Sequence, residues 1–205
     1  MRRFHGRASI ALMAAAAFAI LPAGPAVADT AWTVTPGGPT GFVGSASFGY
    51  IDCPNSELGG SVQSGSGLSG FGLFSITSAR FGSFADPVSC AGAAGILMRV
   101  TATGLPWGFN AMTYTNGVAY GSMTGVTMAL HGSDECDATV GGPAGALGTI
   151  GASYDNASGM LTLSDGDLEV AAVDSDCDPT LINVGDRFPV QGQFQSKPVH
   201  TVTSP

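Results

Sequence analysis

After its first 28 residues, the chain consists of short β-rich segments separated by turn signals that contain glycine. The clearest case is TYTNGVAYGSM at 113–123, where Asn116-Gly117 supplies the two positive-φ positions of a type I′ turn. A second hairpin is predicted at 150–163. No segment repeats apolar residues at the helical period over a useful length. Short strands joined by closely spaced turns predict an all-β fold, a single antiparallel sandwich or barrel-like domain.

The composition agrees with this fold class. The chain has 31 glycines and is rich in threonine, serine and valine, which favours strands and tight turns over helices. The glycine-rich stretch 59–72 is either a flexible loop or a strand, and the sequence leaves both open. Outside the two hairpins, strands are expected at 31–35, 42–53, 71–81, 95–103, 109–115, 167–173 and 188–194.

Residues 1–28 have the three parts of a secretory signal peptide. Arginines precede an apolar run at 8–21, and Ala-Val-Ala at 26–28 forms an A-x-A cleavage site. The apolar run is too short to span a bilayer as a mature helix, although a retained anchor is the alternative. We therefore expect cleavage after Ala28 and a secreted, extracellular domain at 29–205, with no membrane insertion after cleavage.

The charge balance after residue 28 limits the kinds of partner that the chain is expected to bind. Four cations stand against fifteen acids, a formal net charge of −11. Nucleic-acid affinity depends on basic patches that neutralise phosphates, so we do not expect this chain to bind nucleic acid. Anionic membrane surfaces are disfavoured for the same reason. A cell-wall glycan or a protein remains the expected kind of partner. The four cations are Arg80, Arg99, Arg187 and Lys197.

Four cysteines lie in the part expected to be exported: Cys53, Cys90, Cys136 and Cys177. An even number in an oxidising compartment predicts disulfides. Three connectivities are possible, and sequential pairing is favoured because it closes two loops of similar length. Zinc spacing is absent, since there is no C-x-x-C pair and histidine is sparse. No metal or cofactor is expected.

The motif DSDCDP at 174–179 resembles the start of a calcium loop. An EF-hand needs glycine at position 6 and glutamate at position 12, where this chain has Pro179 and Gly185. Pairing of Cys136 with Cys177 would nevertheless bring two acidic flanks together as a candidate cation cluster. The alternative is a solvated acidic turn beside a disulfide. The cluster comprises Asp134, Glu135, Asp137, Asp174, Asp176 and Asp178.

Two further kinds of site have candidates. Trp107, Tyr114 and Tyr120 are candidates for an aromatic face that stacks on a sugar or peptide, but packing of Trp107 in the core is the favoured interpretation. A carboxylate pair could hydrolyse glycosides, but a catalytic acid needs a pocket that raises its pKa. No strand–turn–helix elbow for a serine nucleophile is found. We therefore assign no catalytic residue.

Four segments of the chain form a recognisable set. They are WTVTPGG at 32–38, TATGLPWGFNAMTY at 101–114, SYDNASGMLTL at 153–163 and TVTSP at 201–205, with the four cysteines between them. As a set they resemble a family of actinobacterial secreted β-rich proteins of unassigned function. The resemblance implies export, disulfides and an all-β domain, and it carries over no catalytic residue.

These observations favour a secreted, non-catalytic extracellular β domain that is envelope-associated or binds a ligand such as a carbohydrate. Two alternatives stay open. One is a secreted hydrolase that uses a carboxylate pair, and the other is a small-molecule carrier.

Overall fold

The computed structural model describes residues 28–36, 42–46 and 49–203. The predicted signal peptide lies outside these residues except for Ala28, which begins the first strand. Two single 3₁₀ turns, Ala93–Gly95 and Pro143–Gly145, interrupt an otherwise β structure. The strands are β1 (Ala28–Pro36), β2 (Phe42–Ala46), β3 (Gly49–Cys53), β4 (Glu57–Ser66), β5 (Phe74–Arg80), β6 (Cys90–Ala91), β7 (Leu97–Thr103), β8 (Trp107–Thr115), β9 (Val118–Gly132), β10 (Asp137–Gly141), β11 (Gly148–Asp155), β12 (Met160–Ser164), β13 (Glu169–Val173), β14 (Val190–Lys197) and β15 (Val202–Thr203).

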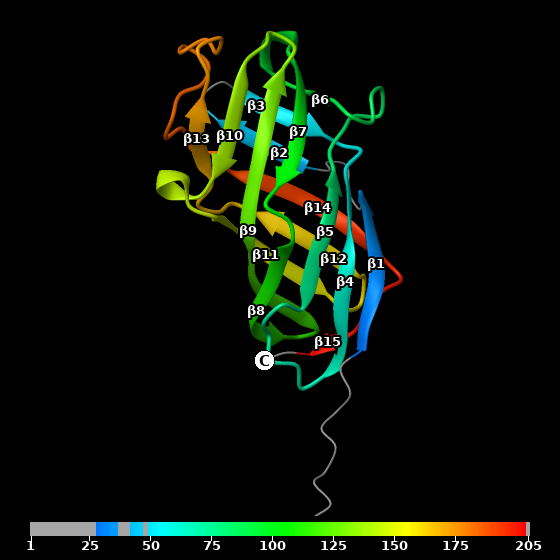
Figure 1. The fold of residues 1–205 in the computed structure, drawn as a ribbon. Coiled ribbons are helices and arrows are strands. Elements are labelled where there is room, and N and C mark those ends of the chain that lie inside the picture. The colour runs from blue at the N-terminus through cyan, green and yellow to red at the C-terminus, as the bar shows by residue number, and fades with distance from the viewer. Residues whose placement is uncertain (1–27, 37–41, 47–48, 204–205) are drawn as a thin grey trace, which may run out of the picture.

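Eight strands close into an antiparallel barrel, in the order β1-β4-β5-β8-β9-β11-β12-β14. The ring is completed where β14 pairs back with β1, from Thr33↔Lys197 to Pro36↔Phe194. Closure removes the two exposed edges that an open sheet would have. The prediction of an all-β sandwich or barrel-like domain is therefore confirmed, with the barrel as the form adopted (Figure 1).

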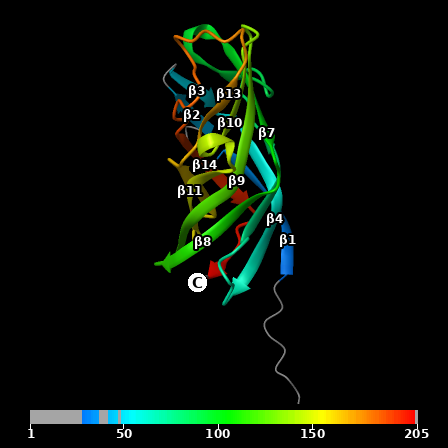
Figure 2. The same ribbon diagram turned by 60° about the vertical axis from the view of Figure 1, so that its left-hand side comes forward.

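The barrel wall continues upward in Figure 1 through shorter strands. The first half of β9 lies between β8 and β11, and its second half lies between β7 and β10. In the same way β14 pairs first with β2 and then with β1. Figure 2 shows β9 running through both parts of the wall. Three positions of the wall are thus each filled by two consecutive strands: β7 and β8, β10 and β11, and β1 and β2.

Both predicted hairpins are confirmed. Asn116 has a φ of 52° and Gly117 a φ of 86°, as the turn between β8 and β9 requires. The second hairpin joins β11 to β12 at Asp155↔Met160. Of the stretch 59–72, which the sequence left open, residues 59–66 belong to β4 and residues 67–72 lie outside any strand.

The single strand expected at 42–53 is wrong, because this segment folds into the hairpin of β2 and β3, with Phe42 opposite Cys53. The reversal includes Gly49, whose φ of 116° is one that a residue with a Cβ rarely adopts. Three strands were not foreseen: β6, β10 and β15.

Aromatic rings fill the centre of the lower barrel. The Phe74 ring lies 5.1 Å from Trp32, 5.4 Å from Phe109 and 4.8 Å from Tyr154, measured between ring centroids. All four side chains are buried. A barrel that carries a small molecule keeps space at its centre, so this ring cluster gives no support to the carrier alternative.

The chain end crosses the lower opening of the barrel as a C-terminal latch, defined here as residues 198–203. Its strand β15 runs parallel to β4. The Tyr154 hydroxyl donates to the His200 carbonyl (3.1 Å) and accepts from the His200 N–H (3.0 Å). The Asn156 amide donates to the Val202 carbonyl (2.8 Å) and accepts from the Val202 N–H (3.0 Å). Two side chains of the β11–β12 hairpin therefore hold the latch through its backbone.

The buried imidazole of the latch predicts a pH dependence of stability. The His200 side chain is 6% exposed, and burial lowers its pKa below the usual 6.5. Between pH 6.5 and that lowered pKa, His200 is protonated in the unfolded chain but stays neutral in the folded chain. The contribution of His200 to stability should therefore be fully present above pH 6.5, and the free energy of unfolding should fall as the pH drops below 6.5.

Urea denaturation followed by tryptophan fluorescence, at pH values between about 5 and 7.5, measures this slope. His200→Gln should lose this part of the slope, whereas His131→Gln, at an exposed histidine, should keep it. The pKa values of the Asp86, Asp155 and Asp178 carboxyls are lowered from 3.8, so these groups change protonation below the pH range of the measurement. Equal slopes for wild type and His200→Gln would contradict the prediction.

Candidate functional site

The two disulfides join Cys53 to Cys90 and Cys136 to Cys177, which confirms the sequential pairing. Cys136 follows the end of β9, and Cys177 lies in the loop after β13. The second disulfide therefore ties two loops together at the upper end of the molecule. The six acidic residues predicted as a cation cluster all belong to these loops or their borders, and they are called the acidic rim below.

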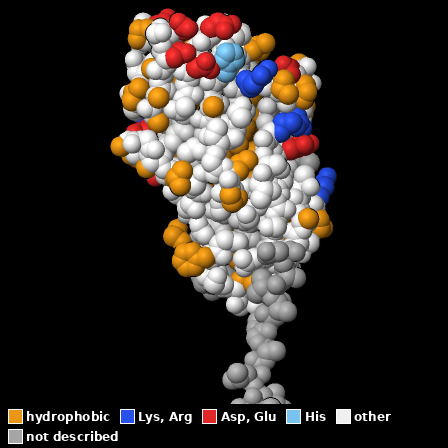
Figure 3. Space-filling view, viewed as in Figure 1, with side chains coloured by type: hydrophobic (Ala, Val, Ile, Leu, Met, Phe, Trp, Pro, Cys, Tyr) orange, Lys and Arg blue, Asp and Glu red, His pale blue; other side chains and the backbone are white. Residues whose placement is uncertain are grey.

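All six acidic-rim side chains are exposed, and Figure 3 shows acidic side chains gathered at the upper end of the molecule. Asp137 pairs with His131, with 2.8 Å between Oδ1 and Nδ1. Asp134 and Asp178 line the same shallow recess beside Ile182. The structure therefore brings the acidic flanks to one end of the barrel, as the disulfide pairing implied.

Two carboxylates of the acidic rim accept hydrogen bonds within their own turns. Asp174 Oδ1 accepts the Asp176 N–H at 3.1 Å. Asp178 Oδ1 accepts the N–H and the hydroxyl of Thr180, each at 2.8 Å, and these bonds lower the Asp178 pKa. Asp174 also lies near the sulfurs of the second disulfide, but sulfurs bonded to each other are not thiolate ligands. Within the described residues this geometry is that of solvated acidic turns, and we assign no cation site there.

The aromatic face predicted from Trp107, Tyr114 and Tyr120 is not formed. Trp107 is 2% exposed, stacks on Phe81 with ring centroids 6.4 Å apart, and donates its indole N–H to the Thr103 carbonyl at 3.2 Å. The Tyr114 hydroxyl accepts from the Asn156 amide, whereas Tyr120 is 49% exposed. The structure places Trp107 in the core, which is the interpretation that the sequence favours, and leaves it unavailable to an aromatic binding face.

The carboxylates do not form an enclosed pair. Among the aspartates and glutamates whose burial the structure describes, none is buried. The pKa of Asp86 is lowered mainly by the Val88 N–H, and that of Asp155 mainly by the Ala157 N–H. A general acid for glycoside hydrolysis needs the opposite shift, which burial in an apolar pocket provides.

The barrel wall opens between β5 and β7. β5 pairs with β4 along its whole length but with β8 only over Phe74–Ile76. β7 pairs with β9 throughout but with β6 only at Leu97 and Met98. In the described part of the chain, the edges formed by 77–80 and 99–103 therefore face each other without a ladder of hydrogen bonds.

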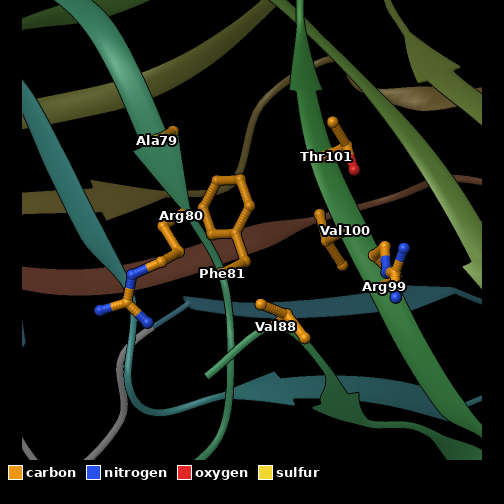
Figure 4. Close-up of a pocket in the computed structure, with 7 residues that line it drawn as sticks. All are labelled: Ala79, Arg80, Phe81, Val88, Arg99, Val100 and Thr101. Atoms are coloured by element: carbon orange, nitrogen blue, oxygen red, sulfur yellow. The ribbon is translucent and has the colours of Figure 1, made fainter. Parts of the chain in front are cut away.

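This opening forms a groove of about 330 Å³, called the β5–β7 groove. Its floor includes the buried side chains of Phe81 and Val100. Figure 4 shows the Phe81 ring between the two strands, with Val88 from the loop before β6 beside it. Ala79 and Thr101 complete the lining on the two strands. The floor is apolar, and the strand edges on either side carry backbone groups outside any ladder.

Two of the four cations in 29–205 border this groove. The Arg80 guanidinium lies 3.0 Å from Glu57 Oε2 and donates to the Pro87 carbonyl at 3.0 Å. Arg99 is exposed and forms no ion pair with a described residue. Arg99 is therefore the cation that a ligand can reach without breaking an ion pair. The pKa of the Asp86 carboxyl is lowered mainly by the Val88 N–H, and the charge of Arg99 also contributes to it as the smallest of four causes.

Sequence reasoning missed the β5–β7 groove. A signal was present, because Arg80 and Arg99 are rare cations of an acidic chain and each lies in a predicted strand, 71–81 or 95–103. Their proximity depends on strand order and register, which local patterns do not specify.

Comparison of the chain with family models, with curated proteins and with solved structures finds no match.

Proposed function

We propose that this protein is an exported, non-catalytic binding module and that its ligand binds in the β5–β7 groove. One observation carries the proposal: the barrel wall has no hydrogen-bond ladder between the described edges 77–80 and 99–103, and it opens there over an apolar floor bordered by arginine. Protein binding sites combine an apolar surface with a few polar groups that fix orientation. The groove has both components.

Export is supported by three features: the disulfides, the first 28 residues and the resemblance to actinobacterial secreted proteins. The four cysteines of the described chain all form disulfides, which persist in oxidising compartments. The first 28 residues have the pattern of a secretory signal peptide. Within the described residues, no helix is long and apolar enough to cross a membrane. The resemblance to actinobacterial secreted proteins points the same way.

The non-catalytic part of the proposal is supported by the carboxylates. Those with described burial are all at least partly exposed, and Asp155 and Asp178 accept hydrogen bonds from their own turns. Neither arrangement is typical of the acid and base of a hydrolase.

A tryptophan placed in the groove tests the proposed site. Thr101 is exposed and lines the groove, so the side chain of Thr101→Trp should occupy it. Thr139→Trp on β10 is the matched control, because Thr139 is also exposed on a strand but lies outside the groove. We expect wild type and Thr139→Trp to retain the same ligand from arrays of defined glycans and peptides, with at least tenfold weaker retention by Thr101→Trp.

Mass spectrometry of the retained ligand tests the non-catalytic part in the same experiment. The ligand should be recovered unchanged after prolonged incubation. Equal retention by Thr101→Trp, or cleavage of the ligand by wild type, would contradict the proposal.

A further inference from the structure

We infer that the ligand of the β5–β7 groove is an extended peptide that carries carboxylate side chains. This inference rests on the proposed function and names the chemical class of its ligand. Three properties of the groove support it: the free strand edges, the apolar floor and the position of Arg99.

The free strand edges provide the first argument. Residues 77–80 and 99–103 each have a partner strand on one side only. The groove side of each edge therefore presents N–H and C=O groups that no described strand pairs with. An extended peptide offers the complementary alternation of donors and acceptors along its own backbone, which is the basis of peptide recognition at sheet edges.

The floor provides the second argument. Val100 and Phe81 are buried beneath the groove, and Val88 is 49% exposed at its rim. Side chains of an extended peptide alternate between two faces, so every second residue can contact this apolar floor. A glycan would favour an exposed aromatic ring for stacking, but Phe81 is only 2% exposed and none of the other lining residues is aromatic. The floor thus favours a peptide over a glycan.

Charge provides the third argument. Arg99 is exposed and has no described ion-pair partner, so a carboxylate can pair with it without displacing one. Of the acidic rim, Asp137 is separated from Arg99 by His131 in the register of β7, β9 and β10, and its carboxylate already pairs with that histidine. Arg80 already pairs with Glu57 and the Pro87 carbonyl, so its contribution to the ligand should be smaller.

Selection from a random peptide library tests the inference. The probe is a phage library of eight-residue peptides, panned on the purified chain with both disulfides intact and counter-selected on Thr101→Trp. We expect the enriched peptides to alternate apolar residues with aspartate or glutamate. Enrichment of basic peptides, or of peptides that bind Thr101→Trp equally well, would overturn the inference.

Fluorescence anisotropy with the most enriched peptide then measures the role of each arginine. Arg99→Gln should weaken binding by about tenfold or more, and Arg80→Gln by less. Arg187→Gln removes the same charge outside the groove and should leave the affinity within about twofold. Equal losses in Arg99→Gln and Arg187→Gln would show a general charge effect and overturn the inference.

The two proposals fail separately. If an array glycan is retained by wild type and lost in Thr101→Trp while no peptide is enriched, the peptide inference is overturned and the binding function stands. If neither a glycan nor a peptide depends on the groove, both proposals are overturned.

Discussion

Phe74→Ala is expected to lower the free energy of unfolding by about 4 kcal/mol, because a large buried side chain is removed where its neighbours cannot easily close the space. Phe74 is 0% exposed and its ring touches the rings of Trp32, Phe109 and Tyr154. These side chains come from β1, β8 and β11, so the lost contacts link three parts of the barrel wall. Urea denaturation at neutral pH measures the loss.

Phe71→Ala is the matched control for this core substitution. Phe71 lies three positions earlier in the sequence but is 76% exposed. Its replacement should change the free energy of unfolding by less than about 0.5 kcal/mol. A loss at Phe74 as small as the loss at Phe71 would mean that the ring cluster is not the packed centre of the barrel.

Replacement of Cys136 and Cys177 by alanine is expected to destabilise the fold by about 4 kcal/mol. The disulfide closes a loop with a sequence separation of 41 residues, and the entropy of that loop in the unfolded chain sets the size of the effect. Cys53 and Cys90 are separated by 37 residues, so the equivalent double replacement should cost a similar amount.

Guanidinium denaturation of the oxidised wild type and of both double variants measures these losses. Wild type with both disulfides reduced gives the reference for the combined effect. A double variant within about 1 kcal/mol of oxidised wild type would show that the fold does not depend on that cross-link.

Local sequence patterns predicted those elements whose backbone conformation is determined by residues close together in the chain. Asn116-Gly117 determines its hairpin through backbone conformations available to those two residues. The disulfide pairing was also favoured correctly, since loop lengths are readable from the sequence. The short strands β6 and β10 were missed because two or five residues give too little pattern to detect.

Features that depend on distant parts of the chain could not be predicted in this way. Barrel closure pairs Thr33 with Lys197, and the latch places His200 against Tyr154. The β5–β7 groove depends on where β8 stops pairing with β5, which is a property of strand register. For Trp107 the sequence favoured a place in the core, but its packing against Phe81, from a distant segment, is visible only in the structure.

The most direct test of peptide binding in the β5–β7 groove is a map of backbone amide shifts by NMR while a peptide with alternating valine and aspartate is added to the chain. We expect saturable changes confined to residues 77–81, Val88 and 99–101, which line or border the groove, and we expect these changes to be lost in Thr101→Trp. Shifts centred on the acidic rim, or no saturable shift at all, would contradict peptide binding in the groove.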